Sequence, residues 1–300
     1  MPTILLTGGT GNAGSHVARQ LLAHGYEILA VSRSKPDFHC RHLRRDLRDL
    51  EGISSEIEST DGIIHLASPR SQDARVTVEE DVLSFHIICR YWRKGSLIFA
   101  SSQVVYGVAV GDICEDSAYH PCGWYDLGKI INELQLQMAC MESGRGAGVS
   151  LRIPILFSTG RRRTDRQFMT DILEHCRKGG SFAFESEADL YANGTSFIGE
   201  EDFAAAAVAA LRIDRTGEYN LAGGFCTWKE LIECAHRFLG SRPRFILRRG
   251  GYSMPDELRL PSSRARLDCS KFQRAANWIP KEALDMLVAR YFQEDQLENG

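Results

Sequence analysis

Short apolar runs and longer amphipathic stretches alternate through the first half of the chain. The apolar runs are rich in Val, Ile and Leu, and they read TILLT (3–7), EILAV (27–31), GIIHLA (62–67), SLIFAS (96–101) and GVSLRI (148–153). Between them, apolar residues recur at helical spacing over 12–24, over 76–94 and from Tyr125 onward. This alternation predicts βαβ units with right-handed crossovers, and hence an α/β fold with a doubly wound parallel sheet.

The alternation is looser in the second half. Helices are predicted over 164–178, over 227–240 and from Lys281 onward, and a strand followed by a helix over 197–212. Thr227 and Glu230 form a capping box at the start of the second of these helices. We therefore expect a first domain over 1–155, which the segment 196–222 rejoins, and a smaller α+β substrate lobe over 156–300, with a cleft between them.

The composition is that of a soluble globular protein, with 43% hydrophobic and 25% charged residues. A net charge of −3 gives no electrostatic drive toward nucleic acid or an anionic membrane. The longest apolar run, 203–211, falls far short of the roughly 18 residues that a membrane span needs. The first residues carry no basic region ahead of their apolar stretch, so we expect no signal peptide. Neither nucleic acid nor a membrane is expected as a partner.

The cysteines are odd in number and irregular in spacing. The nine are Cys40, Cys89, Cys114, Cys122, Cys140, Cys176, Cys226, Cys234 and Cys269. They form no C-x-x-C pair, which argues against a disulfide framework and against a zinc site. The histidines lack metal-binding spacing as well. We therefore expect a cytoplasmic protein in a reducing compartment, without a metal site.

A glycine-rich loop follows the first predicted strand and opens the first predicted helix. It reads TGGTGNAGSHV, with Gly8, Gly11 and Gly14 three residues apart and Asn12 and Ala13 between the last two. A dinucleotide pyrophosphate needs such a turn, because the bare backbone lets it approach and the helix N-terminus offers free N–H groups. We predict that these five residues bind a dinucleotide; a purely structural turn is the alternative.

The end of the second strand bears on which dinucleotide binds. An acidic side chain there binds the free ribose hydroxyl of NAD, whereas an arginine accommodates the 2′-phosphate of NADP. This chain has Ser32 and Arg33 at that place, and a guanidinium binds phosphate bidentately. NADP is therefore favoured over NAD, unless Arg33 is a surface residue without a ligand. Asp46, after a third predicted strand, could accept a hydrogen bond from the adenine amino group, and its neighbour Leu47 is a further cofactor contact.

Three polar residues are candidates for chemistry at the same edge of the sheet. Ser102 stands at the end of the SLIFAS strand, within FASSQVVYG (99–107), and open α/β sheets bind ligands at the carboxyl ends of their strands. Tyr125 and Lys129, in YDLGK, are four residues apart and therefore share one helix face. Alone, such a pair is common in solvated helices; beside the serine and the glycine loop it indicates a catalytic group.

Taken in this order, the segments resemble the extended short-chain dehydrogenase/reductase family, the NAD(P)-dependent epimerase/dehydratase group. The resemblance covers nearly the whole chain and implies a Rossmann-type first domain. The further matching segments are HLAS (65–68), Glu133 four residues beyond the lysine, FIGEED (197–202), EYNLAGG (218–224) and LDCSKFQRAANWIP (267–280).

The resemblance implies a role for each residue of the constellation. Tyr125 would exchange the proton of a substrate hydroxyl, Ser102 would hydrogen-bond the same oxygen, and Lys129 would hold the nicotinamide ribose. A phenol ordinarily titrates near pH 10, and a nearby ammonium stabilises its phenolate. The cofactor contacts implied after the fourth strand are Leu66, Ala67 and Ser68.

The serine loop sets this chain apart from the family's dehydratases. Ser102 is preferred over Ser101, because the matching family serine stands four residues before the VYG tyrosine, here Tyr106. Gln103 and Val104 replace the acidic pair of the sugar 4,6-dehydratases, and neither can serve as acid or base. This argues against dehydratase chemistry and leaves Gln103 as a substrate contact.

Other departures concern the helix and the substrate. YDLGK has Asp126 and Gly128 where the family pattern is YGxSK, and we expect Asp126 to face solvent. Ile155 replaces an asparagine and Thr195 a phosphate-binding arginine, which weakens the assignment to nucleotide sugars. Cations that could bind a diphosphate instead are Arg161 and Arg162, followed by Arg163, Arg166, Arg242 and Arg244.

Two mechanisms fit these residues. A sugar epimerase would oxidise a carbinol and return the hydride to the other face, whereas a keto-sugar reductase would take one hydride from NADPH. Arg33 favours the reductase and the family favours the epimerase, so both stay open for a sugar that we expect to be nucleotide-linked. A third possibility is an NADP-binding sensor or structural protein without turnover. The resemblance also implies a homodimer that pairs the helices at 76–94 and 125–141.

Overall fold

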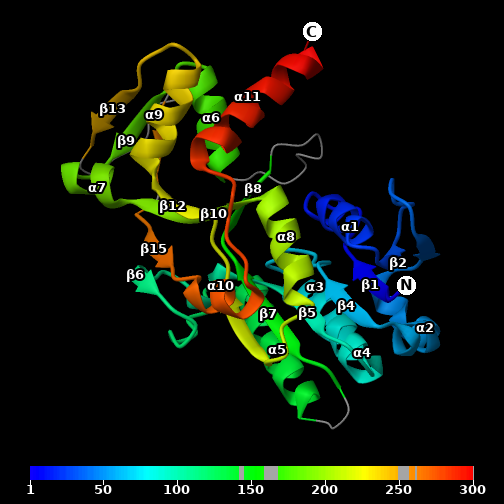
Figure 1. The fold of residues 1–300 in the computed structure, drawn as a ribbon. Helices are drawn as coiled ribbons and strands as arrows, with labels where there is room; N and C mark the ends of the chain where they lie inside the picture. Colours follow the sequence, from blue (N-terminus) through cyan, green and yellow to red (C-terminus); the bar gives the residue numbers. More distant parts are fainter. Residues whose placement is uncertain (142–144, 159–167, 249–256, 261, 300) are drawn as a thin grey trace.

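The computed structural model describes residues 1–141, 145–158, 168–248, 257–260 and 262–299 (Figure 1). Its centre is a seven-stranded sheet with the order β11-β7-β5-β4-β1-β2-β3, and all strand pairs in it are parallel. These strands are β1 (Thr3–Thr7), β2 (Glu27–Ser32), β3 (Arg41–Arg44), β4 (Gly62–His65), β5 (Leu97–Ser102), β7 (Gly148–Ile153) and β11 (Gly217–Asn220).

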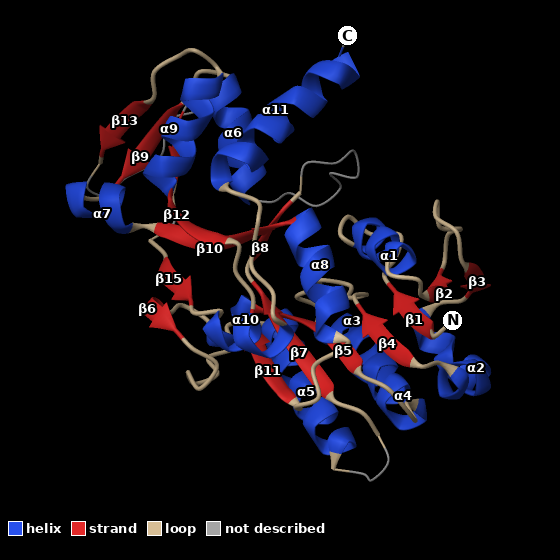
Figure 2. Ribbon diagram, in the orientation of Figure 1, coloured by secondary structure: helices blue, strands red, loops and turns tan. Residues whose placement is uncertain are grey.

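Helices cover both faces of the sheet (Figure 2). One face carries α1 (Gly14–Ala23), α8 (Glu200–Ala210) and α10 (Ser270–Ala276), and the other carries η1 (Leu47–Ile53), α2 (Ser54–Ser59), α4 (Leu83–Tyr91) and α5 (Trp124–Cys140). Ile4 and Leu6 of β1 pack on the first face and Leu5 on the second, as the two-residue period of a strand requires. The predicted doubly wound α/β fold is confirmed.

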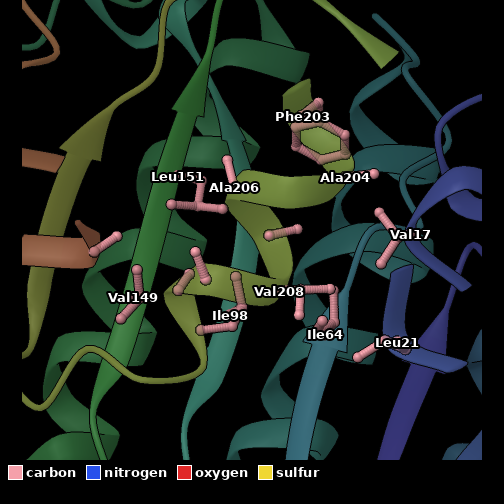
Figure 3. Packing of buried hydrophobic residues seen from close by; sticks show 14 of the residues in the cluster. Val17, Leu21, Ile64, Ile98, Val149, Leu151, Phe203, Ala204, Ala206 and Val208 are labelled. Atoms are coloured by element: carbon pink, nitrogen blue, oxygen red, sulfur yellow. The ribbon is translucent and has the colours of Figure 1, made fainter. Parts of the chain in front are cut away.

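Helix α8 packs on the sheet beside α1 (Figure 3). Ala204 and Ala206 of α8 are completely buried, together with Val17 of α1 and Leu151 of β7. Because alanine side chains are small, the backbone of α8 can approach both the strands and α1 closely. Close packing on this side holds the glycine loop, which connects β1 to α1, against the end of the sheet.

The remaining elements form smaller sheets and a helical layer beyond the carboxyl ends of the main strands (Figure 1). One sheet pairs β10 (Gly194–Gly199) with β8 (Ile155–Phe157) and β12 (Gly224–Thr227), and a second pairs β9 (Ser181–Phe184) with β13 (Arg244–Leu247) and β14 (Glu257–Arg259). A two-stranded sheet contains β6 (Val110–Ile113) and β15 (Arg264–Leu267). The helices are α6 (Phe168–Arg177), α7 (Glu187–Ala192), α9 (Trp228–Phe238) and α11 (Leu284–Asn299). Among the described residues, no helix is both long and apolar enough to cross a membrane.

The elements differ from the sequence prediction in detail. The stretch expected as one helix over 76–94 comprises α3 (Ala74–Val76), the π-helix η2 (Thr77–Val82) and α4, which ends at Tyr91. A short 3₁₀-helix, η3 (Gln103–Tyr106), follows β5. The capping box of Thr227 and Glu230 at α9 is confirmed. Within 196–222, α8 and β11 pack on or join the main sheet, whereas β10 pairs with β8 and β12.

A buried ion pair connects α5 to β7. Glu133 and Arg152 have exposed side-chain fractions of 0% and 2%, and the guanidinium donates from Nε and Nη2 to the two carboxylate oxygens at 3.1 and 2.8 Å. Arg152 also donates to the hydroxyls of Tyr106 and Tyr119, at 2.8 and 2.9 Å. Burial raises the pKa of Tyr106 to about 12, so its hydroxyl stays protonated and donates to Asn220 of β11 at 2.6 Å. This network fixes α5, η3, β7 and β11 relative to one another.

Removing the arginine should destabilise the protein strongly. In Arg152→Met, Glu133 stays buried without a cation, and the loss of one partner of a buried pair costs about 3–5 kcal/mol. Urea unfolding followed by circular dichroism measures the change. The control Arg75→Met removes one partner of the exposed pair Arg75–Glu79 and should leave the unfolding midpoint almost unchanged. Equal effects of the two substitutions would contradict the prediction.

Candidate functional site

Two positions of the glycine loop leave no room for a side chain. Gly8 has a φ of +72°, and a Cβ there would lie 2.7 Å from the backbone nitrogen of Ala67. A Cβ on Gly14, the first residue of α1, would lie 2.1 Å from the carbonyl oxygen of Gly8. The turn closes with Gly11 N–H donating to that same carbonyl at 3.0 Å. Bare backbone and the N-terminus of α1 therefore face the space above the loop.

A cavity of about 460 Å³ opens at this loop. Its walls come from the loop and from the ends of β2, β3 and β4. They include every predicted cofactor residue except Lys129, namely Gly8, Gly11, Asn12, Ala13, Gly14, Ser32, Arg33, Asp46, Leu47, Leu66, Ala67 and Ser68. The topology thus brings into one cavity residues that are up to about sixty positions apart in the sequence.

The part of this cavity next to β2 and β3 combines cations with the carboxylate of Asp46, and Glu80 also lines the cavity. Arg33 lines it together with Arg45, which the sequence analysis did not single out although it follows β3 at the same sheet edge. Asp46 accepts from the backbone N–H and Nε of Arg48, at 3.1 and 2.9 Å, and these hydrogen bonds lower the pKa of Asp46. Ser32 donates to the carbonyl of Ser34 at 2.7 Å.

A smaller cavity of about 120 Å³ adjoins the first and contains the predicted chemical constellation. Ser102 comes from the end of β5, and Tyr125 and Lys129 from the first two turns of α5. Five residues line both cavities: Ala13, Leu66, Ser68, Arg70 and Leu156. Arg70 was not predicted, and its φ of +48° is uncommon for a residue with a side chain.

The two serines of the loop have different surroundings. Ser101 is buried and its hydroxyl donates to Glu133 of the ion-pair network. Ser102 caps η3, where its Oγ accepts from the backbone N–H of Val104 at 3.4 Å, a long contact that leaves the hydroxyl proton for another acceptor. This geometry favours Ser102 over Ser101 as the residue that meets a ligand.

Tyr125 and Lys129 lie against each other as their spacing predicts. The Lys129 ammonium lies 5.5 Å from the centre of the Tyr125 ring and 4.8 Å from that of Phe99. The lysine is buried, and its Nζ lies 3.9 Å from a carboxylate oxygen of Asp81, which is buried too. The sequence analysis missed Asp81, because EED in an amphipathic stretch is typical of a solvated helix face.

Local backbone features bring Asp81 to the lysine. Asp81 belongs to the π-helix η2, and the extra residue in such a turn changes which side chains point inward. Helix α5 approaches this turn at Gly128, where a Cβ would lie 2.6 Å from Cγ2 of Thr77. The departure from the family pattern at Gly128 therefore has a steric reason.

His65 is a packing and hydrogen-bonding residue. It is buried at the end of β4, with Nδ1 2.8 Å from Thr7 Oγ1. Its ring is stacked with that of Phe99 and tilted against that of Phe85. Burial, and then the positive charge of Lys129, lower the pKa of His65 to about 3. The imidazole is therefore neutral at physiological pH.

One expectation for α5 is wrong. Asp126 does not face solvent: it is 7% exposed, and its carboxylate accepts from the backbone N–H of Cys122 at 2.9 Å. Through this hydrogen bond the carboxylate stabilises the turn ahead of α5, and its negative charge is also favourable in the first turn of a helix.

The predicted substrate residues are placed unevenly. Gln103 is partly buried, and within the described part of the chain its Oε1 has no hydrogen-bond partner. Thr195 is buried and donates to the carbonyl of Ser196 at 3.0 Å, and Arg244 donates to the carbonyl of Gly179. The arginines that fall outside the described residues are Arg161, Arg162, Arg163 and Arg166.

Curated relatives match over parts of the chain. Sterol-4-alpha-carboxylate 3-dehydrogenase, decarboxylating, of Dictyostelium discoideum is 24% identical over 53% of this chain and 55% of its own length. The chain spans about half the length, or less, of the first relatives it matches. UDP-glucuronic acid decarboxylase 1 of Arabidopsis thaliana is 26% identical over 94% of this chain and 67% of its own length.

A solved structure shares the fold over the whole length. UDP-glucose-4-epimerase of Stenotrophomonas maltophila, with bound NAD and formylated UDP-arabinopyranose, superposes with a TM-score of 0.81 over 100% of this chain and 99% of that one, at 18% identity. The profile of the NAD dependent epimerase/dehydratase family matches residues 4–222. The family resemblance found in the sequence is thereby confirmed, and the chain belongs to the NAD-dependent epimerase/dehydratase family.

Proposed function

We propose that this chain is an NADP(H)-dependent oxidoreductase that acts at a hydroxyl or carbonyl carbon of a sugar. The observation that supports this most is the meeting of Ser102, Tyr125 and Lys129 in a small cavity that adjoins the larger cavity over the glycine loop. One cavity offers groups that bind an oxygen and move its proton, and the other offers the glycine backbone and helix N-terminus that a dinucleotide pyrophosphate needs.

The residues of the larger cavity fit a dinucleotide. Gly8 and Gly14 leave bare backbone where a pyrophosphate would approach, and α1 offers its N-terminus. Ser68 Oγ is buried without a hydrogen-bond partner among the described residues, as expected of a group that a ligand completes. When bound, the nicotinamide supplies or accepts a hydride.

The chain's own groups handle the oxygen and its proton. Tyr125 Oη would give a proton to a carbonyl oxygen during reduction, or take one from a hydroxyl during oxidation. Ser102 Oγ would hydrogen-bond the same oxygen and hold it beside the phenol. Lys129 would hold the cofactor's ribose.

A preference for NADP over NAD is supported by charge. Arg33 and Arg45 both line the end of the cavity next to β2 and β3, and two guanidiniums can bind a 2′-phosphate that a carboxylate would repel. Ser32 stands where an NAD-binding chain would have an acid.

Both the class of sugar substrate and the choice between epimerisation and reduction remain to be proposed from the site and the relatives. Curated relatives are named as acting on UDP-glucuronic acid and on a sterol carboxylate, and a structural neighbour is a UDP-glucose-4-epimerase. A nucleotide-linked sugar is therefore one proposal, with Arg161 and Arg162 as the cations for its diphosphate. Thr195 is buried and bonded to backbone, so it cannot replace the missing arginine, and this counts against a nucleotide-linked substrate. Arg33 and Arg45 favour NADPH and hence reduction of a keto-sugar, so epimerisation stands second.

A homodimer is proposed through the outer faces of α4 and α5. These two helices pack side by side on one face of the sheet (Figure 1). Leu134 and Met138 of α5 are 45% and 65% exposed, and a hollow between the helices is lined by both of them and by Arg90 and Arg93.

All nine cysteines are free thiols, which supports a reducing, cytoplasmic location.

Removing the phenol hydroxyl should abolish turnover without loss of cofactor. Tyr125→Phe should lower kcat by about 10²–10⁴-fold, the usual contribution of a general acid–base group, and leave the Kd of NADPH unchanged. NADPH oxidation with a panel of nucleotide-linked and free keto-sugars is the assay, and Tyr191→Phe, an exposed tyrosine, is the control. Unchanged turnover in Tyr125→Phe would refute the proposal, and a wild type that binds NADPH but turns over no sugar would favour the sensor reading.

Cofactor preference should depend on Arg33. Arg33→Ala should weaken NADPH binding roughly tenfold or more, because a hydrogen bond to a charged group contributes about 1.5–3 kcal/mol. NADH binding should change little, since NADH lacks the 2′-phosphate. Calorimetric titration measures both affinities, with Arg41→Ala as the control because Arg41 lies on β3 outside the cavity lining. Equal weakening of NADPH and NADH would show that Arg33 does not read the 2′-phosphate.

A further inference from the structure

Lys129 has a buried anion beside it that the roles given above do not use. Asp81 lies 3.9 Å from Lys129 Nζ, and the exposed side-chain fractions of the two residues are 1% and 2%. Within the described part of the chain, neither carboxylate oxygen of Asp81 has a hydrogen-bond partner. A buried carboxylate without hydrogen bonds needs a nearby cation, and the ammonium of Lys129 is the cation beside it.

Among the described residues, the other groups near Lys129 are two aromatic rings and an imidazole. Tyr125 of α5 and Phe99 of β5 present their rings to Nζ, at 5.5 and 4.8 Å from the ring centres. His65 of β4 is buried and neutral, because burial and then the charge of Lys129 lower its pKa to about 3. Lys129 and Asp81 of η2 together therefore carry no net charge. The other cation on the wall of the small cavity is Arg70, which also lines the larger one.

The contact between η2 and α5 is built into the backbone. Gly128 precedes Lys129, and a Cβ at this position would lie 2.6 Å from Thr77 Cγ2 and 3.5 Å from Asp81 Oδ2. The residue at position 128 is thus the smallest one available at the point of closest approach, and the π-turn of η2 directs Asp81 toward α5. Two independent local features serve one contact.

We propose that Asp81 is a positioning residue that cancels the charge of Lys129, so that Tyr125 keeps its proton and enters the reaction as the proton donor. An uncompensated ammonium would favour the phenolate, a base suited to oxidising a hydroxyl. With the charge cancelled, the phenol is an acid suited to reducing a carbonyl. The inference rests on the proposed function and narrows it to carbonyl reduction.

The reaction step balances with a reduced nicotinamide as the reductant. The Oη–H bond of Tyr125 breaks and its proton goes to the substrate's carbonyl oxygen, while the carbonyl carbon gains the hydride that the reduced nicotinamide gives up. The C=O π bond opens to an alcohol. The phenolate left on Tyr125 takes a proton from solvent, which restores the site.

A titration of the protein without substrate tests the proposal. The near-ultraviolet absorbance of tyrosinate is followed against pH in the wild type and in Tyr125→Phe, and the difference isolates Tyr125. The same difference is measured between Asp81→Asn and the double variant Asp81→Asn/Tyr125→Phe. We expect the midpoint of the Tyr125 signal to fall by about one pH unit in the Asp81→Asn background, because an ammonium within a few ångströms then acts uncompensated.

The matched control changes the same charge in the same helical turn. Glu79→Gln removes a carboxylate two residues away that is exposed and paired with Arg75, and it should leave the Tyr125 midpoint where it is in the wild type. If Asp81→Asn does not fold, Asp81→Ser, a smaller neutral residue, is titrated in the same way with the same expectation.

Two results would overturn the proposal. One is the same Tyr125 midpoint with and without the Asp81 carboxylate, and the other is an equal shift in Glu79→Gln, which would make the effect one of general surface charge. The titration needs no turnover, so its outcome is independent of the activity assay on Tyr125→Phe. A failed activity assay would refute the proposed function, whereas a failed titration would refute only the role of Asp81.

Discussion

The buried pair of Glu133 and Arg152 is the constraint on which the arrangement of the site depends. Two charges removed from water must satisfy each other, and the surrounding hydroxyls complete the pairing. Because Glu133 also accepts from Ser101, one carboxylate ties α5 to both β5 and β7. The ends of those strands and the start of α5 carry Ser102 and Tyr125, so their separation is set by a network that lies beneath them.

Three polar side chains of α5, spaced four residues apart, lie on one face of the helix. Tyr125 lies at the cavity, Lys129 one turn deeper against a carboxylate, and Glu133 a further turn deeper against a guanidinium. The polarity of the pairs alternates: the helix supplies the cation at the second level and the anion at the third. The charges of Lys129 and Glu133 on this face are thus each compensated by a buried partner of opposite sign.

How far the sequence predicts this protein follows from the range of each interaction. The glycine triplet, the strand pattern and the Tyr125–Lys129 spacing depend on a few neighbouring residues, so the doubly wound sheet and its glycine loop were predictable. Asp81 was not, because its inward direction depends on a π-turn and on the close approach of another helix. Asp126 was misjudged for a similar reason, since its partner is a backbone N–H group of the turn ahead of the helix. The short strands of the second half depend on long-range pairing and carry little periodic signal of their own.

The identity of the dinucleotide that the purified protein carries tests the account most directly. The protein is denatured without prior exchange, and mass spectrometry identifies and counts what is released. The account predicts NADP or NADPH, in less than one equivalent per chain and readily exchanged, as for a reductase that releases its oxidised cofactor. One equivalent of NAD per chain, retained through purification, would contradict it, because it would make Arg33 irrelevant to cofactor choice and would indicate a recycled hydride carrier.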